Sequence, residues 1–440
     1  MVKLKFSEFM TRLNQATHIL PLIILRIGFG ALMLFSLLRF VYRGWISDFF
    51  IIPQFHFTYL GFAWVEPLSA NGMYCVFAIL IISTIGIMLG ALYRLNILIF
   101  FLLFSYIELI DKATYLNHYY FISVMSFLMI WLPLNRLCSV DAYFRPHIRQ
   151  TSVPFWMVFI VRFQLGIVYF FAGFAKLNPD WMLDALPMAI WLKANTGFPI
   201  IGRLFDYHWV ALLMSWAGAF YDLTIPFWLS FRKIRPFAYL TVIIFHLMTA
   251  MLFNIGVFPY VMIVMTLIFF DAEDYHRLFA RYNPQQPIPN TQPIKTWVVI
   301  ALLLFFSYQM LMPLRHYLYA GDTNWTMEGY NFAWRVMLNE KTGYTTFTVI
   351  NPQTEQRWLV YGSEYLSDQQ MRLMTYQPDM MVQFAHFLET RYRENPEDNL
   401  IVTVEAYVTH NGRPSRLIID PTRDLSDIQR TIWASDWILH

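Results

Sequence analysis

A lysine at the end of a long apolar run has the position best suited to act as a base. Lys176 directly follows the apolar stretch IVYFFAGFA (167–175). Two interpretations are open: its amine reaches the lipid headgroups, as amphipathic side chains at membrane borders do, or it lies in a dry pocket. Desolvation in such a pocket disfavours the ammonium form and leaves a free amine able to take up a proton. The second interpretation predicts general-base chemistry at this position.

Two histidines are the next candidates. His118 lies in the sequence Asn117-His118-Tyr119-Tyr120 at the start of an apolar segment. An imidazole there can hydrogen-bond an anion or orient a ring, and an ordinary interfacial histidine is the alternative. His246 lies deep within another apolar segment, where a packed, hydrogen-bonded histidine is the alternative.

Several polar or ionisable side chains fall inside apolar segments. Such groups are costly in a membrane and are candidates for function by default. The alternative is that they pair with each other across helices and hold the bundle together. The set consists of Arg26, Arg162, Gln164, Asp222 and His246.

The motifs of many soluble enzymes and of metal sites are missing. The sequence has no GxGxxG, P-loop, HExxH, GxSxG or EF-hand pattern. Cys75 and Cys138 form no CxxC. Both are predicted to be core thiols, and a disulfide between them is the alternative. No cluster of His, Cys, Asp and Glu has the spacing of metal ligands, so a bound metal or haem is not expected.

The elements that carry these residues are predicted to be membrane helices. The hydrophobic fraction is 57% and the charged fraction 14%, against about 45–50% and about 25% in soluble domains. The last part of the chain differs: residues 1–313 have a net charge of +8, and residues 314–440 a net charge of −5. The overall +3 therefore does not indicate a nucleic-acid partner.

Nine segments are apolar enough, or nearly so, to cross a bilayer, which takes about 20 residues. The fold class predicted is a polytopic α-helical membrane protein with about nine transmembrane helices and a mixed α/β C-terminal domain. The stretch 181–202 is predicted to be interfacial. The segments are 18–38, 71–93, 95–110, 117–134, 154–175, 208–231, 236–255, 257–270 and 296–313.

The positive-inside rule orients the chain. With the N-terminus in the cytoplasm, the cytoplasmic segments hold 13 lysines and arginines and the opposite loops hold 6. Three domains are predicted: a cytoplasmic N-terminus (1–17), a transmembrane catalytic domain (18–313) and a non-cytoplasmic domain (314–440). The loops at 111–118, 174–181 and 253–259 emerge on the side of the C-terminal domain.

The C-terminal part alternates strand and helix patterns. TTFTVI (345–350) and RWLVYG (357–362) predict a hairpin, and LIVTVEAYVTH (400–410) and SRLIID (415–420) predict another. Residues 369–393 have helical spacing. A Pro/Gln-rich loop at 284–295 precedes the last span.

Several motifs resemble those of the vitamin K-dependent gamma-glutamyl carboxylases. The main one combines Ala172-Gly173, Lys176-Leu177 and Asp180-Trp181 within VYFFAGFAKLNPDW (168–181). The resemblance covers nearly the whole chain in the same order. Its other parts are DKATYLNHYY (111–120), FHLMTAMLFNIGVFPYVM (245–262), NWTMEGYNFAWRVM (324–337), IIDPTRDL (418–425) and QRTIW (429–433).

The resemblance implies a reaction and a set of roles. Members oxygenate vitamin K hydroquinone with O2 to the epoxide, and the strong base formed removes a γ-proton from a peptide glutamate, to which CO2 adds. The implied base for the hydroquinone is Lys176, with Asn117 and His118 beside the quinone and His246 as the buried histidine. The region after the last span implies glutamate binding by Asn324, Trp325, Tyr330 and Trp334.

Three functions are therefore compared. The first is vitamin K-dependent carboxylation of a glutamate-containing peptide or protein, with membrane lipids as the surroundings. The second is epoxidation of vitamin K hydroquinone without protein carboxylation. The third is a lipid or anion transporter or binding scaffold, in which Lys176 and His118 grip an anionic headgroup.

Overall fold

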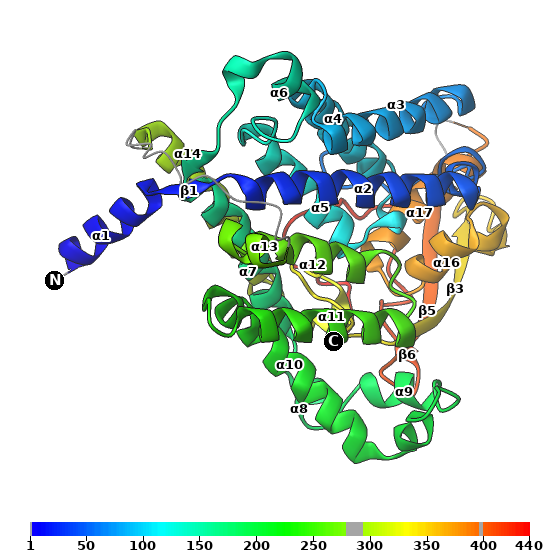
Figure 1. Cartoon of the computed structure of the whole chain (residues 1–440). Helices are drawn as coiled ribbons and strands as arrows, with labels where there is room; N and C mark the ends of the chain where they lie inside the picture. Colours follow the sequence, from blue (N-terminus) through cyan, green and yellow to red (C-terminus); the bar gives the residue numbers. More distant parts are fainter. Residues whose placement is uncertain (1, 279–293, 396–398) are drawn as a thin grey trace.

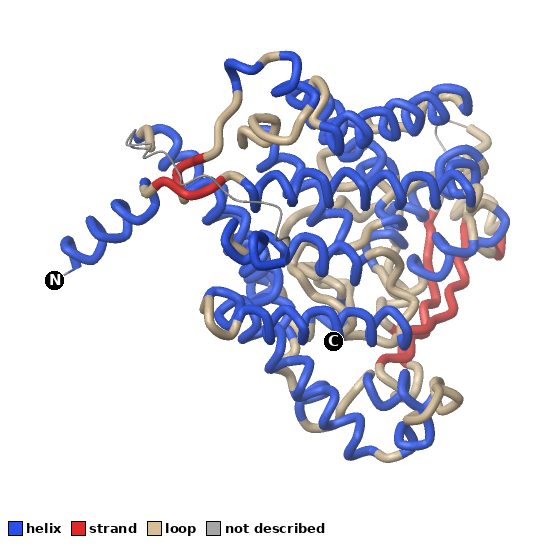
Figure 2. Tube along the Cα trace, in the orientation of Figure 1, coloured by secondary structure: helices blue, strands red, loops and turns tan. Residues whose placement is uncertain are grey.

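The computed structural model describes the backbone of residues 2–278, 294–395 and 399–440. Helices make up the first two thirds of the chain, and the larger sheet belongs to the last third (Figure 2). The predicted Pro/Gln-rich loop at 284–295 lies almost wholly outside the described residues.

Seven helices among the described residues are long and apolar enough to cross a membrane. A helix satisfies its own backbone hydrogen bonds, which is why long apolar segments adopt it in lipid. The last of them continues from α14 into a 3-10 turn and has few contacts with the rest of the protein. The seven are α2 (Leu20–Tyr42), α3 (Ala70–Leu89), α4 (Tyr93–Ile110), α7 (Trp156–Ala175), α10 (His208–Ser230), α11 (Arg235–Leu252) and α14 (Thr296–Leu311) with η6 (Met312–Leu318).

The two remaining apolar segments are shorter helices inside the bundle. Helix α5 (Asn117–Trp131) has 15 residues, and α12 (Phe258–Thr266) has 9 before the 3-10 turn η5 (Leu267–Phe269). Both lie among the longer helices (Figure 1). The predicted polytopic helical fold is confirmed, but these two helices are shorter than the thickness of a bilayer requires.

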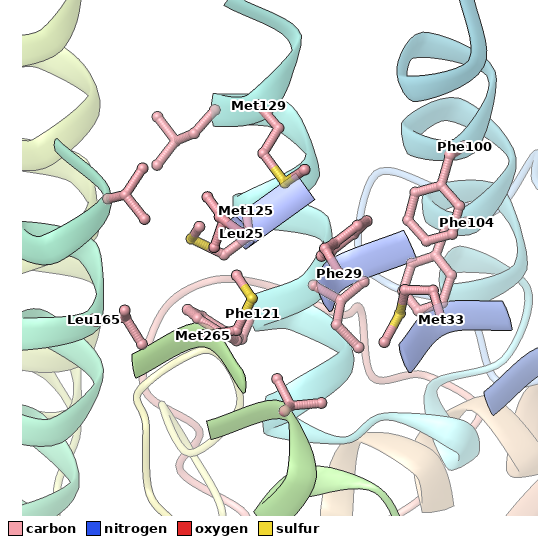
Figure 3. Close-up of a cluster of buried hydrophobic side chains, with 14 of the residues drawn as sticks. Leu25, Phe29, Met33, Phe100, Phe104, Phe121, Met125, Met129, Leu165 and Met265 are labelled. Carbon is pink, nitrogen blue, oxygen red and sulfur yellow. The ribbon is translucent and has the colours of Figure 1, made fainter. Parts of the chain in front are cut away.

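Aromatic and sulfur-containing side chains fill the centre of the helical body (Figure 3). Phe29 of α2 meets Phe100 of α4 edge to face, with ring centroids 5.4 Å apart. Close helix contact also depends on glycine: a Cβ at Gly30 would lie 2.7 Å from the backbone nitrogen of Met88. The centre of the body is therefore apolar and closely packed.

The alternative in which the polar side chains of the bundle pair with each other is not what the structure shows, because their partners lie outside that set. Arg26 donates to the carbonyl oxygens of Leu134 and Cys138. Arg162 forms an ion pair with Asp271, which lies between η5 and the next helix. Asp222 binds a residue outside that set, described below. The prediction for the cysteines is wrong, because the side chains of Cys75 and Cys138 are both free and exposed.

The predicted interfacial stretch contains two short helices rather than a span. These are α8 (Pro179–Met182) and α9 (Met188–Lys193), which pack against α10.

The N-terminal end of the body carries α1 (Val2–Asn14) and a small ladder in which β1 (Ala16–His18) pairs with β2 (Ser152–Pro154). Figure 1 shows α1 at one end of α2 and the larger sheet at the other. Short helices α6 (Val140–Phe144) and α13 (Ala272–Leu278) complete the body.

The C-terminal region has a four-stranded antiparallel sheet in the order β4-β3-β5-β6. Both predicted hairpins are present. The predicted helix over 369–393 is two helices, because Pro378 starts a new one after Gln377. The elements are α15 (Thr323–Thr326), β3 (Lys341–Ile350), β4 (Arg357–Val360), α16 (Asp368–Met374), α17 (Pro378–Tyr392), β5 (Ile401–His410) and β6 (Arg416–Leu417).

Side-chain alternation explains how this sheet packs. Phe347 and Val349 of β3 lie opposite Val404 and Val402 of β5, and all four are buried. Residues two apart on a strand share one face, and α17 packs against both strands. The sheet therefore has one apolar face, covered by α17.

Candidate functional site

Lys176 lies at the C-terminal end of α7 and is buried, with 6% of its surface exposed. Its Nζ donates to Oδ2 of Asp222 at 2.8 Å and to the carbonyl oxygen of Ala172 at 3.1 Å. The amine therefore points into the protein, toward α10, and not outward. Among the described residues that bond Lys176, Asp222 is the one that carries charge.

A glycine one turn earlier makes this pair possible. A Cβ at Gly173 would lie 2.8 Å from the backbone nitrogen of Leu223 and 3.0 Å from the Cβ of Asp222. These distances are shorter than ordinary contacts, so any larger residue would force α7 and α10 apart. The Ala172-Gly173 part of the sequence motif thus has a structural reason.

The pair changes what the sequence predicted for the lysine. The lysine is buried, as the second interpretation requires, but it lies 2.8 Å from a carboxylate and is not alone in an apolar pocket. Asp222 is itself buried, so the contact between the two groups offsets part of the cost of removing both from water. We call Lys176 and Asp222 the dyad.

The segment after Lys176 closes over the dyad. Asn178 caps α8 by accepting a hydrogen bond from the Trp181 backbone N–H at 3.0 Å. The Trp181 ring lies 5.3 Å from Nζ of Lys176, and its Nε1 donates to the Ser215 carbonyl at 2.7 Å. The Asn-Pro-Asp-Trp sequence therefore places an aromatic cover over the lysine.

His246 of α11 lies on the same side of α7, at a tyrosine that the sequence reasoning missed. Nε2 of His246 and the hydroxyl of Tyr169 are 3.1 Å apart. Tyr169 precedes Lys176 by two helical turns, which puts both on one face of α7. Nδ1 of His246 is buried and has no hydrogen-bond partner among the described residues.

His118 joins this cluster through Phe258 of α12. The Phe258 ring lies 5.8 Å from the His118 ring and 5.9 Å from the His246 ring. Asn117 points elsewhere: its Nδ2 donates to the backbone oxygen of Arg335 at 2.8 Å. The structure thus places His118 and His246 on either side of Phe258, and connects His246 to α7 through Tyr169, two helical turns before Lys176.

Two of the four predicted glutamate-binding residues lie in packed interiors. Trp325 is buried in the C-terminal core, where its Nε1 donates to the Leu439 carbonyl at 2.7 Å. Trp334 is buried in the helical body and stacks on Tyr120 with centroids 4.8 Å apart. Tyr330 is partly buried, and burial raises its pKa. The geometry gives these rings a packing role.

Asn324 differs from these three residues, because it lines a cavity of about 320 Å³. The cavity lies between the end of α7, the 3-10 turn η6 and the segment that follows it. Its wall includes Ala175 and Leu177, the chain neighbours of Lys176. Oδ1 of Asn324 accepts a hydrogen bond from Nη1 of Arg335 at 2.9 Å.

A polar contact connects the lysine segment to the C-terminal sheet. Both carboxylate oxygens of Asp180 accept from Arg413, at 2.8 and 2.6 Å, and Oδ2 also accepts from Asn411 at 2.8 Å. Burial raises the pKa of Asp180, but the hydrogen bonds from Arg413 and Asn411 outweigh it and hold that pKa below its usual value. We call Asp180, Asn411 and Arg413 the latch.

A buried lysine in the C-terminal domain has an unusual charge state. Nζ of Lys341 donates to the Trp325 carbonyl at 2.6 Å and lies 5.7 Å from the Tyr376 ring. Burial lowers the pKa of Lys341 from 10.5 to about 7, with Asp322 opposing the change and Arg416 adding to it. Part of the population is therefore neutral at physiological pH.

This pKa predicts how stability depends on pH. Between pH 7 and about 10, the unfolded chain binds a proton at Lys341 that the folded domain does not, so the free energy of unfolding rises with pH by up to about 1.4 kcal/mol per unit. Lys341→Met is expected to flatten this rise. Thermal unfolding of the purified protein from pH 7 to 9.5 measures it, with exposed Lys193→Met as the control. An equal rise in Lys341→Met and the parent would contradict the assignment.

Some of these residues could be predicted from the sequence. Asp222 is an ionisable group within a predicted span, and Asp180 and Trp181 belong to the quoted motif. Tyr169 and Arg335 also lie within quoted motifs, at 168–181 and 324–337, but nothing local distinguishes them from their neighbours. Arg413 and Lys341 lie outside those motifs, and the role of each of the four residues depends on a partner that the fold brings to it.

Two family models match the chain. The model described as HTTM domain matches residues 14–273, and the one described as vitamin K-dependent gamma-carboxylase, lumenal domain, matches residues 294–440. The first match covers more than half of the chain. No solved structure matches the chain.

Proposed function

Because the chain belongs to the vitamin K-dependent gamma-carboxylase family, we propose that it oxygenates vitamin K hydroquinone to the epoxide and adds CO2 to glutamate in a peptide or protein. The observation that carries the proposal is the buried dyad of Lys176 and Asp222. It is a proton acceptor built into a site that the protein itself screens from water. The apolar helices and the family matches support a multi-pass membrane protein of carboxylase type, and the match to a lumenal-domain model supports an extracytoplasmic C-terminal domain.

The first proposed step is deprotonation of the hydroquinone. A phenol-like hydroxyl has a pKa of about 10, so a base must be close by for it to ionise at neutral pH. Asp222 takes the proton of the Lys176 ammonium, and the free amine then takes the hydroquinone proton. The oxygenated quinone supplies the strong base that removes the γ-proton of glutamate, and CO2 adds to the resulting carbanion.

The polar groups around the dyad are proposed to hold the quinone. His118 and His246 flank Phe258, so the two imidazoles can hydrogen-bond oxygens while the aromatic ring contacts the apolar body of the quinone. Tyr169 sets the orientation of His246. Asn117 supports the segment around Arg335 instead, so its proposed part in quinone binding is to position that wall.

The packed body supplies the medium for this chemistry. A carbanion survives only where water cannot protonate it before CO2 adds. The apolar interior around α5, α7 and α12 and the Trp181 cover meet that need. For the glutamate, Asn324 faces a cavity, and Trp325, Tyr330 and Trp334 are proposed to support its walls.

The orientation of the chain is part of the proposal. The C-terminal domain lies at the opposite end of α2 from α1 (Figure 1). With the domain outside the cytoplasm, we propose a cytoplasmic N-terminus at 1–17, in agreement with the distribution of lysine and arginine. The proposed division is a catalytic body at 18–313 and a substrate-handling domain at 314–440.

One assay tests the proposal directly. Purified protein with vitamin K hydroquinone and O2 is expected to form the epoxide, and with a glutamate peptide and labelled CO2 it is expected to fix the label. Epoxide without fixed label would mean epoxidation without carboxylation. Absence of both from folded protein would leave only the binding or transport function.

The latch provides a further prediction. Arg413→Gln removes the bidentate contact to Asp180 and is expected to lower kcat about 10-fold, because small displacements of a catalytic group reduce rates strongly. Arg413→Lys keeps the charge and is expected to retain more activity. The fixed-label assay measures both, with exposed Arg391→Gln as the control. A wild-type rate for Arg413→Gln would mean that the latch does not position Lys176.

A further inference from the structure

The lipid-facing side of the last membrane helix continues beyond α14. Leu304 and Leu311 of α14 are exposed, as apolar side chains on a membrane span can be, because lipid covers them. The helix runs without a break into η6, where Tyr317 and Leu318 are exposed as well. The apolar surface of this span therefore reaches the start of the C-terminal domain.

The tail of the chain lies against the end of this span. The Tyr319 hydroxyl, directly after η6, donates to the Ile432 carbonyl at 2.9 Å, and Gly321 packs against the His440 ring. In Figure 1 the C-terminus lies level with α11, a membrane helix, whereas β3 and β5 lie beyond the end of that helix. The end of the chain therefore lies closer to the membrane body than the sheet does.

The loop before α3 lies beside the same tail. Nη2 of Arg430 donates to the Thr58 carbonyl at 2.7 Å, and residues 59–65 of the loop follow directly. These seven residues carry no charge, and neither do residues 317–321 or 431–435. Three uncharged segments from distant parts of the chain thus lie side by side where the membrane body meets the C-terminal domain.

These segments expose large apolar side chains, several of them aromatic. Trp64 is 76% exposed, Trp433 73% and Leu318 76%. Exposed apolar groups gathered in one place mark a surface that contacts a partner or a membrane, and Trp and Tyr are frequent at the border between lipid and water. We call the set the collar, which consists of Leu60, Phe62, Trp64, Tyr317, Leu318, Ile432 and Trp433.

We propose that the collar inserts into the membrane leaflet on the side of the C-terminal domain and holds this domain against the lipid. The collar is continuous with the exposed side of α14, which a bilayer must cover, and this favours lipid over a protein partner. An exposed acidic residue directly follows each uncharged segment, namely Glu66, Asp322 and Asp436. An apolar surface with such a polar border is typical of groups that lie in the membrane interface. The insertion does not depend on the proposed reaction.

Depth-dependent quenching tests the insertion without turnover. Trp433→Cys is made in a background of Cys75→Ala and Cys138→Ala, because both native thiols are exposed. The full-length protein is labelled with a fluorescent dye and placed in phosphatidylcholine nanodiscs. A nitroxide near the lipid headgroups is expected to lower the emission about twofold, since interfacial groups lie about 5–10 Å deep. A nitroxide at the end of the acyl chain is expected to lower it less, and iodide in the buffer to have little effect.

Labelled control positions calibrate the measurement. Leu304→Cys, near the middle of α14, is expected to respond most to the deep nitroxide, and exposed Arg391→Cys of α17 to iodide alone. Trp64→Cys repeats the test on the loop, and thermal unfolding confirms that each variant is folded. Quenching of Trp433→Cys and Trp64→Cys by iodide but not by the nitroxide lipids would overturn the inference. Protection from both quenchers, with a doubled mass in detergent, would assign the collar to a second copy of the chain instead.

Discussion

Replacing Lys176 with methionine is expected to lower both epoxide formation and CO2 fixation at least 1000-fold. Methionine fills about the same space but accepts no proton, and general-base catalysis contributes about 10²–10⁴-fold to a rate. Nζ of Lys176 contacts Asp222, Ala172 and the Trp181 ring, so the substitution removes the amine that these groups hold in place. Epoxide is measured by chromatography and fixed label by scintillation counting.

Rescue distinguishes a base from a packing group. A small primary amine added to Lys176→Gly is expected to restore part of the epoxidation, because it can occupy the space of the missing side chain. Lys193→Met, in the exposed part of α9, is expected to keep the parental rate. Parental activity in folded Lys176→Met would show that the lysine is structural.

Replacing Asp222 with leucine is expected to destabilise the protein by about 3–5 kcal/mol, the usual effect of leaving a buried charge without its partner. The 2.8 Å contact joins α7 to α10, and Lys176 has no second carboxylate among the described residues. A lower midpoint of thermal unfolding in detergent measures the effect. The single variant is also expected to lose epoxidation, because Lys176 loses the contact that holds its amine in position.

The double variant is the decisive comparison. Lys176→Met with Asp222→Leu removes both charges, and similar apolar groups can replace a buried ion pair at little cost or with a gain. Its unfolding midpoint is expected to return close to that of the parent while activity stays absent. Additive losses of stability in the double variant would show that the two side chains do not act as a pair.

The sequence by itself determined the membrane body and the identity of the principal residue. Apolar segments and their lengths are local properties, so the helices could be predicted from hydropathy. The two hairpins of the C-terminal domain followed from alternation and turn residues. Lys176 stood out because a charge after a long apolar run is unusual at any single position of the chain.

Only the tertiary structure decided which groups work together. Lys176 and Asp222 are 46 residues apart, and Asp180 and Arg413 are 233 apart. Such pairs depend on how helices rotate and how closely they approach, as at Gly173, and no local pattern encodes that geometry. The same reason explains why Trp325 and Trp334 lie in packed cores while Arg335 faces the cavity. Burial is a property of the whole fold, whereas hydropathy belongs to the segment.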